Sequence, residues 1–194
     1  MKNIVELLEE IRSIAQMGLT YTKDNHDKIR FEKLLSLAAD QYSDIYKLDR
    51  KTIAEQFKNE VGSITPKVGV NGIITNENGQ FLLEKRADDH KMGLIGGWID
   101  PNETPEIAIK REFLEETQLE IDIIKMIGIV SRKAGDFQQP HSTIHILYHC
   151  TIVSGTLQKS YESDMIGYFD PKTINHWHRD HLQMIEKYNN YSAS

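Results

Sequence analysis

Several features that would place the chain in a specialised class are absent from its sequence. One cysteine among 194 residues excludes an intrachain disulfide. The formal net charge at pH 7 is −6, whereas a nonspecific nucleic-acid binder needs a basic face that displaces counterions. No signal-peptide pattern and no apolar run of membrane-spanning length are present. We therefore expect a cytoplasmic protein that does not enter a membrane, and the acidic balance disfavours nucleic-acid binding.

The single cysteine and two nearby histidines also lack the pattern of a catalytic or metal-binding set. Cys150 lies in an apolar, strand-like run, which predicts a buried structural thiol. His145 and His149 lie in the same run, and their spacing from Cys150 is not that of a zinc site. We expect structural roles for all three.

Acidic residues, in contrast, are concentrated in one stretch of the chain. Residues 100–122 contain eight carboxylates and two cations. Within this stretch Thr104, Pro105 and Glu106 indicate the start of a helix: a hydroxyl N-cap, a proline at the first helical position and an acid at the positive end of the dipole. The helical pattern continues to about Thr117.

The periodicity of this helix places three acids together. At 3.6 residues per turn, Glu112, Glu115 and Glu116 share one face. Ile107 and Leu114 are predicted to face the core from the opposite side.

Two explanations of the three acids remain open from spacing alone. Like charges at these separations repel one another, and a hard divalent cation such as Mg2+ relieves the repulsion while retaining waters for a substrate phosphate. Alternatively, the acids form a solvated helix face on which Arg111 pairs with Glu115. That pairing neutralises Glu115 and leaves Glu112 and Glu116 without a counter-charge.

The acidic stretch also matches a known motif. The Nudix box reads Gly-x5-Glu-x7-Arg-Glu-U-x-Glu-Glu-x-Gly-U, in which U is a bulky apolar residue. The fixed positions are occupied here by Gly97, Glu103, Arg111, Glu112, Glu115 and Glu116, with Phe113 and Leu119 at the two U positions. The chain therefore resembles the Nudix (MutT-like) hydrolase superfamily.

Four positions depart from the family pattern. Gln118 stands where the box has a glycine, just past the helix end, where a left-handed backbone is common. Asn102 replaces a frequent glycine, a milder change because asparagine tolerates positive φ. Upstream, Met92 and Ile95 replace a usual tryptophan and proline. These changes affect loop rigidity and leave every expected metal ligand in place.

The resemblance implies an α/β/α sandwich around a mixed β-sheet, and an enzyme that hydrolyses phosphorus anhydrides with Mg2+ or Mn2+. It implies that the metal is held by Gly97, Glu112, Glu115 and Glu116. Arg111 and Glu103 would orient the loop and its acids. The general base would be Glu112 or Glu162, a glutamate in the loop before the final strand, and the sequence does not choose between them.

The N-terminal part of the chain is predicted to be a small helical module. Apolar residues at helical spacing mark helices over residues 2–17 and 25–45, and a shorter one after Asp49. Gly18 is predicted to stop the first. Three such helices alone bury little surface, so we expect the module to pack on another structure.

A linker over residues 62–66 divides the chain into a module at 1–64 and a catalytic domain at 65–194. Residues 18–34 resemble the N-terminal module of a Nudix subgroup that acts on nucleoside diphosphates linked to another moiety X, including CDP-choline and ADP-ribose. In that subgroup the module makes dimer contacts, which implies a homodimer here. The alternative is a helical cap within one chain.

The remaining elements alternate as the family requires. Asn78-Gly79 is a hairpin signal. The expected strands are 68–75, 80–85, 121–131, 143–153 and 167–169, followed by a helix over 176–188.

Candidate substrate contacts lie in two places. Arg86, after the second strand, is expected to point toward the substrate; a solvated strand-end cation is the alternative. The loop 132–142 carries Arg132, Phe137 and His141, cations and an aromatic that would bind a diphosphate and stack on a base. An ordinary surface loop has a similar composition. Two other activities stay open: a degenerate nucleotide-binding sensor and an RNA-end pyrophosphohydrolase, the latter disfavoured by the acidic charge.

Overall fold

The computed structural model of the protein describes residues 3–60 and 63–192. Gly62, where the predicted linker begins, lies outside these ranges. The chain forms two compact units. The helical unit comprises the chain up to Lys67 together with Arg132–Thr143, and the sheet unit comprises Val68–Ser131 and the chain from Ile144 onward. Among the described residues, no helix is long and apolar enough to cross a membrane.

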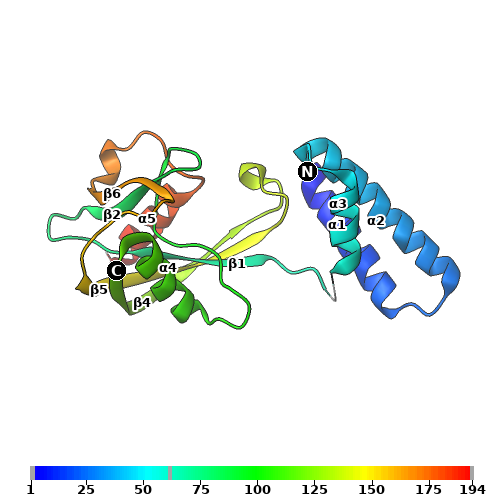
Figure 1. Ribbon diagram of the computed structural model, residues 1–194, viewed down its shortest axis with the longest axis horizontal. Helices are drawn as coiled ribbons and strands as arrows, with labels where there is room; N and C mark the ends of the chain where they lie inside the picture. The colour runs from blue at the N-terminus through cyan, green and yellow to red at the C-terminus, as the bar shows by residue number, and fades with distance from the viewer. Residues whose placement is uncertain (1–2, 61–62, 193–194) are drawn as a thin grey trace. The chain divides into compact units, whose positions relative to one another are not determined.

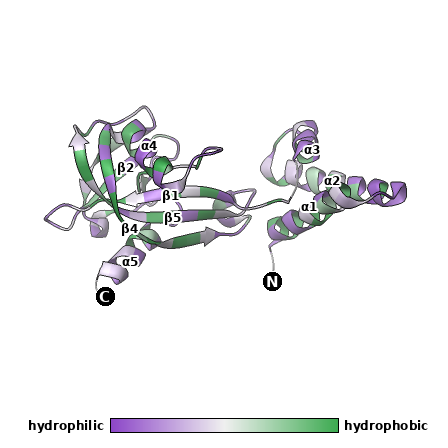
Figure 2. Ribbon diagram, turned by 90° about the horizontal axis from the view of Figure 1, so that it is seen from below, coloured by the Kyte–Doolittle hydropathy of each residue, from purple (hydrophilic) through white to green (hydrophobic). Residues whose placement is uncertain are grey.

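The helical unit contains the three expected helices (Figure 1), which are α1 (Ile4–Tyr21), α2 (Asn25–Tyr46) and α3 (Arg50–Asn59). Each begins at a side chain that accepts a backbone N–H of the first turn, from the N-caps Asn3, Asp24 and Asp49. Apolar and polar residues alternate along all three, as Figure 2 shows in green and purple. Their apolar sides pack on one another.

The prediction that Gly18 ends the first helix is wrong, because α1 continues to Tyr21. A Cβ at Gly18 would lie 2.4 Å from ring atoms of Phe31 on α2. The glycine therefore allows α1 and α2 to approach closely, because the Phe31 ring occupies the space that a side chain at position 18 would need.

One loop of the helical unit comes from the second half of the chain. Ala134 is buried in the same apolar cluster as the three helices. The Tyr42 hydroxyl donates to the Pro140 carbonyl at 2.9 Å, and the Tyr46 hydroxyl to the Gln139 carbonyl at 3.1 Å. The Asn3 amide donates to the Ala134 carbonyl at 3.1 Å. The loop is thus fastened to the helices through its backbone.

The sheet unit contains two three-stranded sheets (Figure 1). The first has the order β1-β5-β4 and the second β3-β2-β6. Strand β2 pairs antiparallel with both of its neighbours. Bridges Gly69↔Trp98 and Gly72↔Ile95 link β1 to the segment after β3. The strands are β1 (Lys67–Ile73), β2 (Phe81–Arg86), β3 (Met92–Gly93), β4 (Leu119–Arg132), β5 (Thr143–Gly155) and β6 (Ser163–Phe169).

The acidic helix forms as predicted, as α4 (Pro105–Thr117) with Thr104 as its N-cap. Gln118 follows it with φ 59°, the left-handed conformation that the family's glycine normally supplies, and its N–H donates to Leu114. Asn102 also has positive φ, at 68°. Both replacements therefore adopt the required backbone.

The predicted core-facing side of α4 is wrong. Ile107 is 57% exposed and Leu114 47%. The buried side consists of Ala108, Ile109, Phe113, Glu116 and Thr117. Ile109 and Phe113 pack in the cluster that includes Leu82 of β2. The buried stripe thus lies on nearly the opposite side of the helix from the predicted one, and Glu116 belongs to it.

The last helix, α5 (His181–Ser192), begins later than residue 176. The intervening segment instead pairs with β3, through a parallel bridge Met92↔Trp177 and a bond from the His178 N–H to the Met92 carbonyl. This pairing requires an extended backbone. Two single-turn 3-10 helices complete the list, at Asp136–Gln138 and Pro171–Thr173.

The expected structural roles of the cysteine and histidines agree with their surroundings. Cys150 is 2% exposed, and burial raises the pKa of its thiol to about 12. His145 is buried and hydrogen-bonded to the Asn71 side chain at 2.9 Å. His149 lies against Tyr188 of α5, 3.2 Å from its hydroxyl.

Candidate active site

Arg111 is the centre of an ion-pair network at the start of the site. Its guanidinium bonds both oxygens of Glu103 at 2.9 Å. It also donates to Glu112 at 2.9 Å and to Glu115 at 3.0 Å. A further bond reaches the Trp98 carbonyl. Arg111 thus joins the glycine loop to the helix and contacts three acids. The alternative of a solvated helix face predicted only its pair with Glu115.

The charges in this network stabilise one another. The hydrogen bond from Arg111 to Glu103 is the largest cause of the raised pKa of Arg111, and the bonds to Glu112 and Glu115 act in the same direction. The same bond lowers the pKa of Glu103. Glu103 and Arg111 therefore remain ionised, and their pairing fixes the loop between the strand and α4.

The glycine loop passes close to two of the acids. Glu116 is 4% exposed, and one of its oxygens accepts the Gly96 N–H at 3.0 Å. A Cβ at Gly96 would lie 2.1 Å from the Val70 carbonyl oxygen, and one at Gly97 would lie 2.5 Å from a Glu112 carboxylate oxygen. Only glycines leave room for this approach. The Gly97 carbonyl accepts the Val70 N–H at 2.8 Å, so one lone pair remains for a metal.

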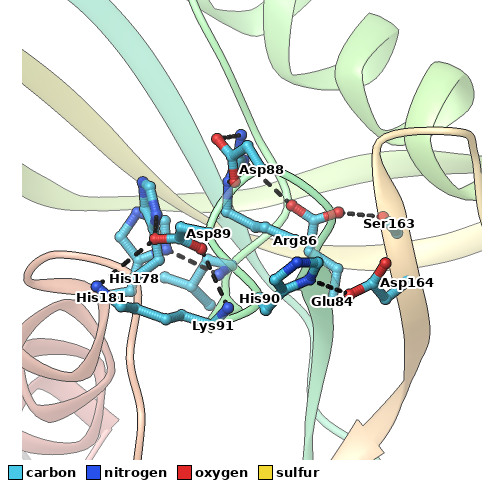
Figure 3. A network of polar contacts seen from close by, with 11 residues as sticks. Glu84, Arg86, Asp88, Asp89, His90, Lys91, Ser163, Asp164, His178 and His181 are labelled. Atoms are coloured by element: carbon cyan, nitrogen blue, oxygen red, sulfur yellow. Dashed lines mark hydrogen bonds and ion pairs between the residues drawn. The ribbon is translucent and has the colours of Figure 1, made fainter.

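A further buried acid, absent from the sequence-based candidates, lies on strand β2. Glu84 is 0% exposed and bonds to Arg86 at 3.3 Å and to the Ser163 hydroxyl (Figure 3). Arg86 is held more closely by Asp88, through two bonds of 3.0 Å each. An acid directly after three apolar residues of the strand was the available signal, but it carries no information about which side chains surround it.

The buried acids destabilise each other's charged forms. Burial raises the pKa of Glu116 to about 9, and the charges of Glu84 and Glu112 act in the same direction. Burial likewise raises the pKa of Glu84 and that of Glu112. A cation bound among the three carboxylates would favour their ionised forms.

The donor set fits a hard divalent cation. Carboxylate oxygens of Glu112 and Glu116, which lie on the inward side of α4, are the ligand type that Mg2+ and Mn2+ prefer. Glu115 is more open, with its side chain 60% exposed. Its second oxygen would be reached from solvent.

Another group of possible ligands lies beside Arg86. Ligand atoms of Asp88, Asp89 and His178 are all within 4.8 Å of one another. Asp88 is bound by Arg86, and Asp89 accepts from His178 Nδ1 at 2.8 Å (Figure 3). Their oxygens are therefore already used in bonds within the protein.

The two candidate bases face the same acidic cluster. The charge of Glu162 contributes to the raised pKa values of Glu112 and Glu84. The Glu162 carbonyl accepts the Ala87 N–H at 2.7 Å, which anchors its turn beside the end of β2.

The candidate substrate contacts are divided between the units. Arg86 is in the sheet unit with the acids. Arg132, Phe137 and His141 belong to the helical unit. Arg132 is 3% exposed, whereas Phe137 is 48% exposed and has a left-handed backbone with φ 51°.

Comparison with known proteins accounts for nearly the whole chain. Residues 65–188 match the NUDIX domain family. Residues 2–57 match a family described as the UDP-X-like, N-terminal oligomerisation domain.

Individual relatives agree with these matches. A putative ADP-ribose pyrophosphatase of Bacillus subtilis is 29% identical over 166 residues, covering 85% of this chain and 79% of its own. An ADP-ribose pyrophosphatase of Methanocaldococcus jannaschii is 28% identical over 63% of this chain and 73% of its own. The crystal structure of a UDP-X diphosphatase aligns with a TM-score of 0.60 and 23% identity, over 97% of this chain and 94% of that one.

Proposed function

The chain belongs to the Nudix family of hydrolases, and we propose that it cleaves the diphosphate bond of a nucleoside diphosphate linked to X with the help of Mg2+ or Mn2+. The products would be a nucleoside monophosphate and phospho-X. The observation that carries this proposal is the burial of Glu116 and Glu112 beside the Gly96-Gly97 loop. Such a group of acids can bind a divalent cation, which in turn binds the phosphates of the substrate.

The residues take separate roles in this reaction. Glu112, Glu115 and Glu116, with the Gly97 carbonyl, would hold the metal, which neutralises phosphate charge and aligns the attacking water. Arg111 and Glu103 position the loop and the acids through their paired bonds.

The proton of the attacking water requires a base near the metal. Glu112 and Glu162 are both candidates, because the charge of Glu162 acts on Glu112. The Arg86 guanidinium now donates to Asp88. Arg86 would bind a substrate phosphate once one of these bonds to Asp88 is broken.

The substrate class follows from the relatives and from the helical module. Relatives named for ADP-ribose and a neighbour named for UDP-X share the diphosphate between a nucleoside and another group. ADP-ribose, CDP-choline and UDP-sugars are therefore the compounds to test first. Arg132, Phe137 and His141 remain our candidates for contacts with the rest of the substrate. We propose a cytoplasmic location for the reaction, as expected from the sequence.

The test is a hydrolysis screen of these compounds, with dinucleoside polyphosphates and NTPs, in Mg2+ and in Mn2+, beside Glu116→Gln. We expect selective release of a monophosphate that disappears in the variant. Binding of a compound without any turnover would contradict the proposal and favour a nucleotide sensor. Gln118 and Asn102 adopt the backbone that glycine would supply, which removes these two departures as a reason to expect an inactive domain.

We further propose that the helical unit forms a homodimer through α1. Four exposed apolar side chains follow this helix at spacings of three, seven and seven residues: Ile4, Leu7, Ile14 and Tyr21. This spacing forms one apolar stripe, and a second copy of the same helix is a self-complementary partner for it. The match to an oligomerisation family supports this occupant. Ile14→Lys should convert a dimer to a monomer in light scattering, and an unchanged mass would contradict it.

A further inference from the structure

Glu84 occupies a position for which the Nudix box gives no role. It lies on β2, and Leu82, two residues earlier, points to the same face because side chains alternate along a strand. Leu82 packs in one cluster with Ile109 and Phe113 of α4. Glu84 therefore lies on the face of β2 that is directed toward α4. It lies beyond Leu82, toward the end of α4 where Glu116 follows Phe113.

Glu84 is not neutralised by its protein contacts. Its bond to Arg86 is 3.3 Å long, whereas Arg86 bonds Asp88 twice at 3.0 Å. Its other oxygen accepts from the uncharged Ser163 hydroxyl (Figure 3). A carboxylate with 0% exposure and one shared cation is costly unless a further positive charge is supplied.

The buried acid on α4 has the same need. Glu116 is 4% exposed, and it accepts a hydrogen bond from the uncharged Gly96 N–H. The charge of Glu84 on β2 disfavours the charged form of Glu116 on α4, so one common counter-ion would stabilise both buried carboxylates.

We propose that Glu84 is a further carboxylate of the metal site, which binds the divalent cation together with Glu112 and Glu116. This inference rests on the proposed function, since it requires that the box acids bind a metal. The Ser163 hydroxyl orients the Glu84 carboxylate, and Ser163 adjoins Glu162 in the chain. Glu84 thereby connects the metal position to the turn that carries a candidate base.

The experiment measures Mn2+ binding by calorimetry, and the melting temperature with and without Mn2+, in the full chain and in Glu84→Gln. We expect the Mn2+ affinity to fall by about 10-fold to 100-fold, as is typical when a supporting carboxylate is lost. The metal-free melting temperature should stay equal or rise, because a buried charge is removed. The increase caused by Mn2+ should shrink.

Matched variants separate a metal role from a merely structural one. Glu77→Gln neutralises an exposed acid of the hairpin turn and should bind Mn2+ like the wild type. Ser163→Ala removes the orienting bond and keeps the charge, so it should lower the affinity less than Glu84→Gln. If Glu84→Gln is not recovered folded, Glu84→Met removes the charge together with the buried polar group and is tested in the same way.

The outcomes are distinct. Wild-type affinity in a folded Glu84 variant overturns the inference and leaves the proposed function standing. A variant that melts lower without metal and keeps its affinity also overturns it, since Glu84 would then only support the fold. A wild-type protein that binds no Mn2+ overturns both proposals.

Discussion

The two compact units bury different kinds of side chain. In the described parts of α1, α2 and α3, the buried residues are apolar or aromatic apart from Gln16, and acids serve as caps at the starts of α2 and α3. In the sheet unit Glu84 and Glu116 are buried, and Glu112 nearly so. Apolar burial stabilises a fold, whereas like charges buried together destabilise it. The helical unit is built for stability, and the sheet unit gives up stability where chemistry requires charge.

The largest expected effect comes from removing one buried charge in the sheet unit, with removal of an exposed charge in the helical unit as the control. Glu116→Gln should lower kcat/KM on the order of a thousandfold, because loss of a metal ligand removes several kcal/mol of transition-state stabilisation. Glu55→Gln, on the exposed side of α3, should leave it unchanged. Steady-state kinetics on the best substrate checks both. Equal losses would remove the contrast between the units.

A core truncation in the helical unit tests the other half of the comparison. Phe57 is 7% exposed, stacks edge-on against Tyr42 and lies under the Arg12 guanidinium. Phe57→Ala should destabilise this unit by about 3–5 kcal/mol. We expect an early melting transition in calorimetry and loss of the dimer in light scattering. A single transition at the wild-type temperature would contradict this expectation.

The pH dependence of stability should differ between metal-free and metal-bound protein. Glu84 and Glu116 bind protons more tightly in the folded state than in the unfolded chain, where glutamate titrates near 4.5. The free energy of unfolding of the metal-free protein should therefore fall as the pH rises from about 5 toward 9. Urea titrations at several pH values measure it. Saturating Mg2+ should flatten the slope, and a slope of the opposite sign would refute the assignment.

The smallest effect concerns the cysteine. Because burial raises the pKa of Cys150 to about 12, its thiol stays protonated at pH 8 and should not react with a thiol reagent in the folded protein. Full reaction is expected in denaturant. Absorbance of the released chromophore distinguishes the two states, and rapid labelling of the native protein would show that β5 opens readily.

Local features were well predicted from the sequence. Thr104 and Pro105 mark the true start of α4, and Gln118 takes the left-handed conformation expected one residue beyond its end. These features depend on neighbours in the chain, so a short stretch contains the needed information. The motif located the acids for the same reason.

Features that depend on distant segments were predicted less well. Gly18 is explained by the ring of Phe31 on the next helix, and the exposed Ile107 by the position of β2 beneath α4. The late start of α5 reflects pairing with β3. Glu84 was missed because Ser163, which donates to it, and Glu116, whose charged form it disfavours, come from elements far along the chain.

The loop fastened by Tyr42, Tyr46 and Asn3 makes the helical module inseparable from a later part of the gene. A recombination event that moved only the first 64 codons to another hydrolase would leave the helices without Ala134 in their core. Residues 132–143 would have to be inherited with them. Lineages that exchange such modules should therefore change both segments together or neither.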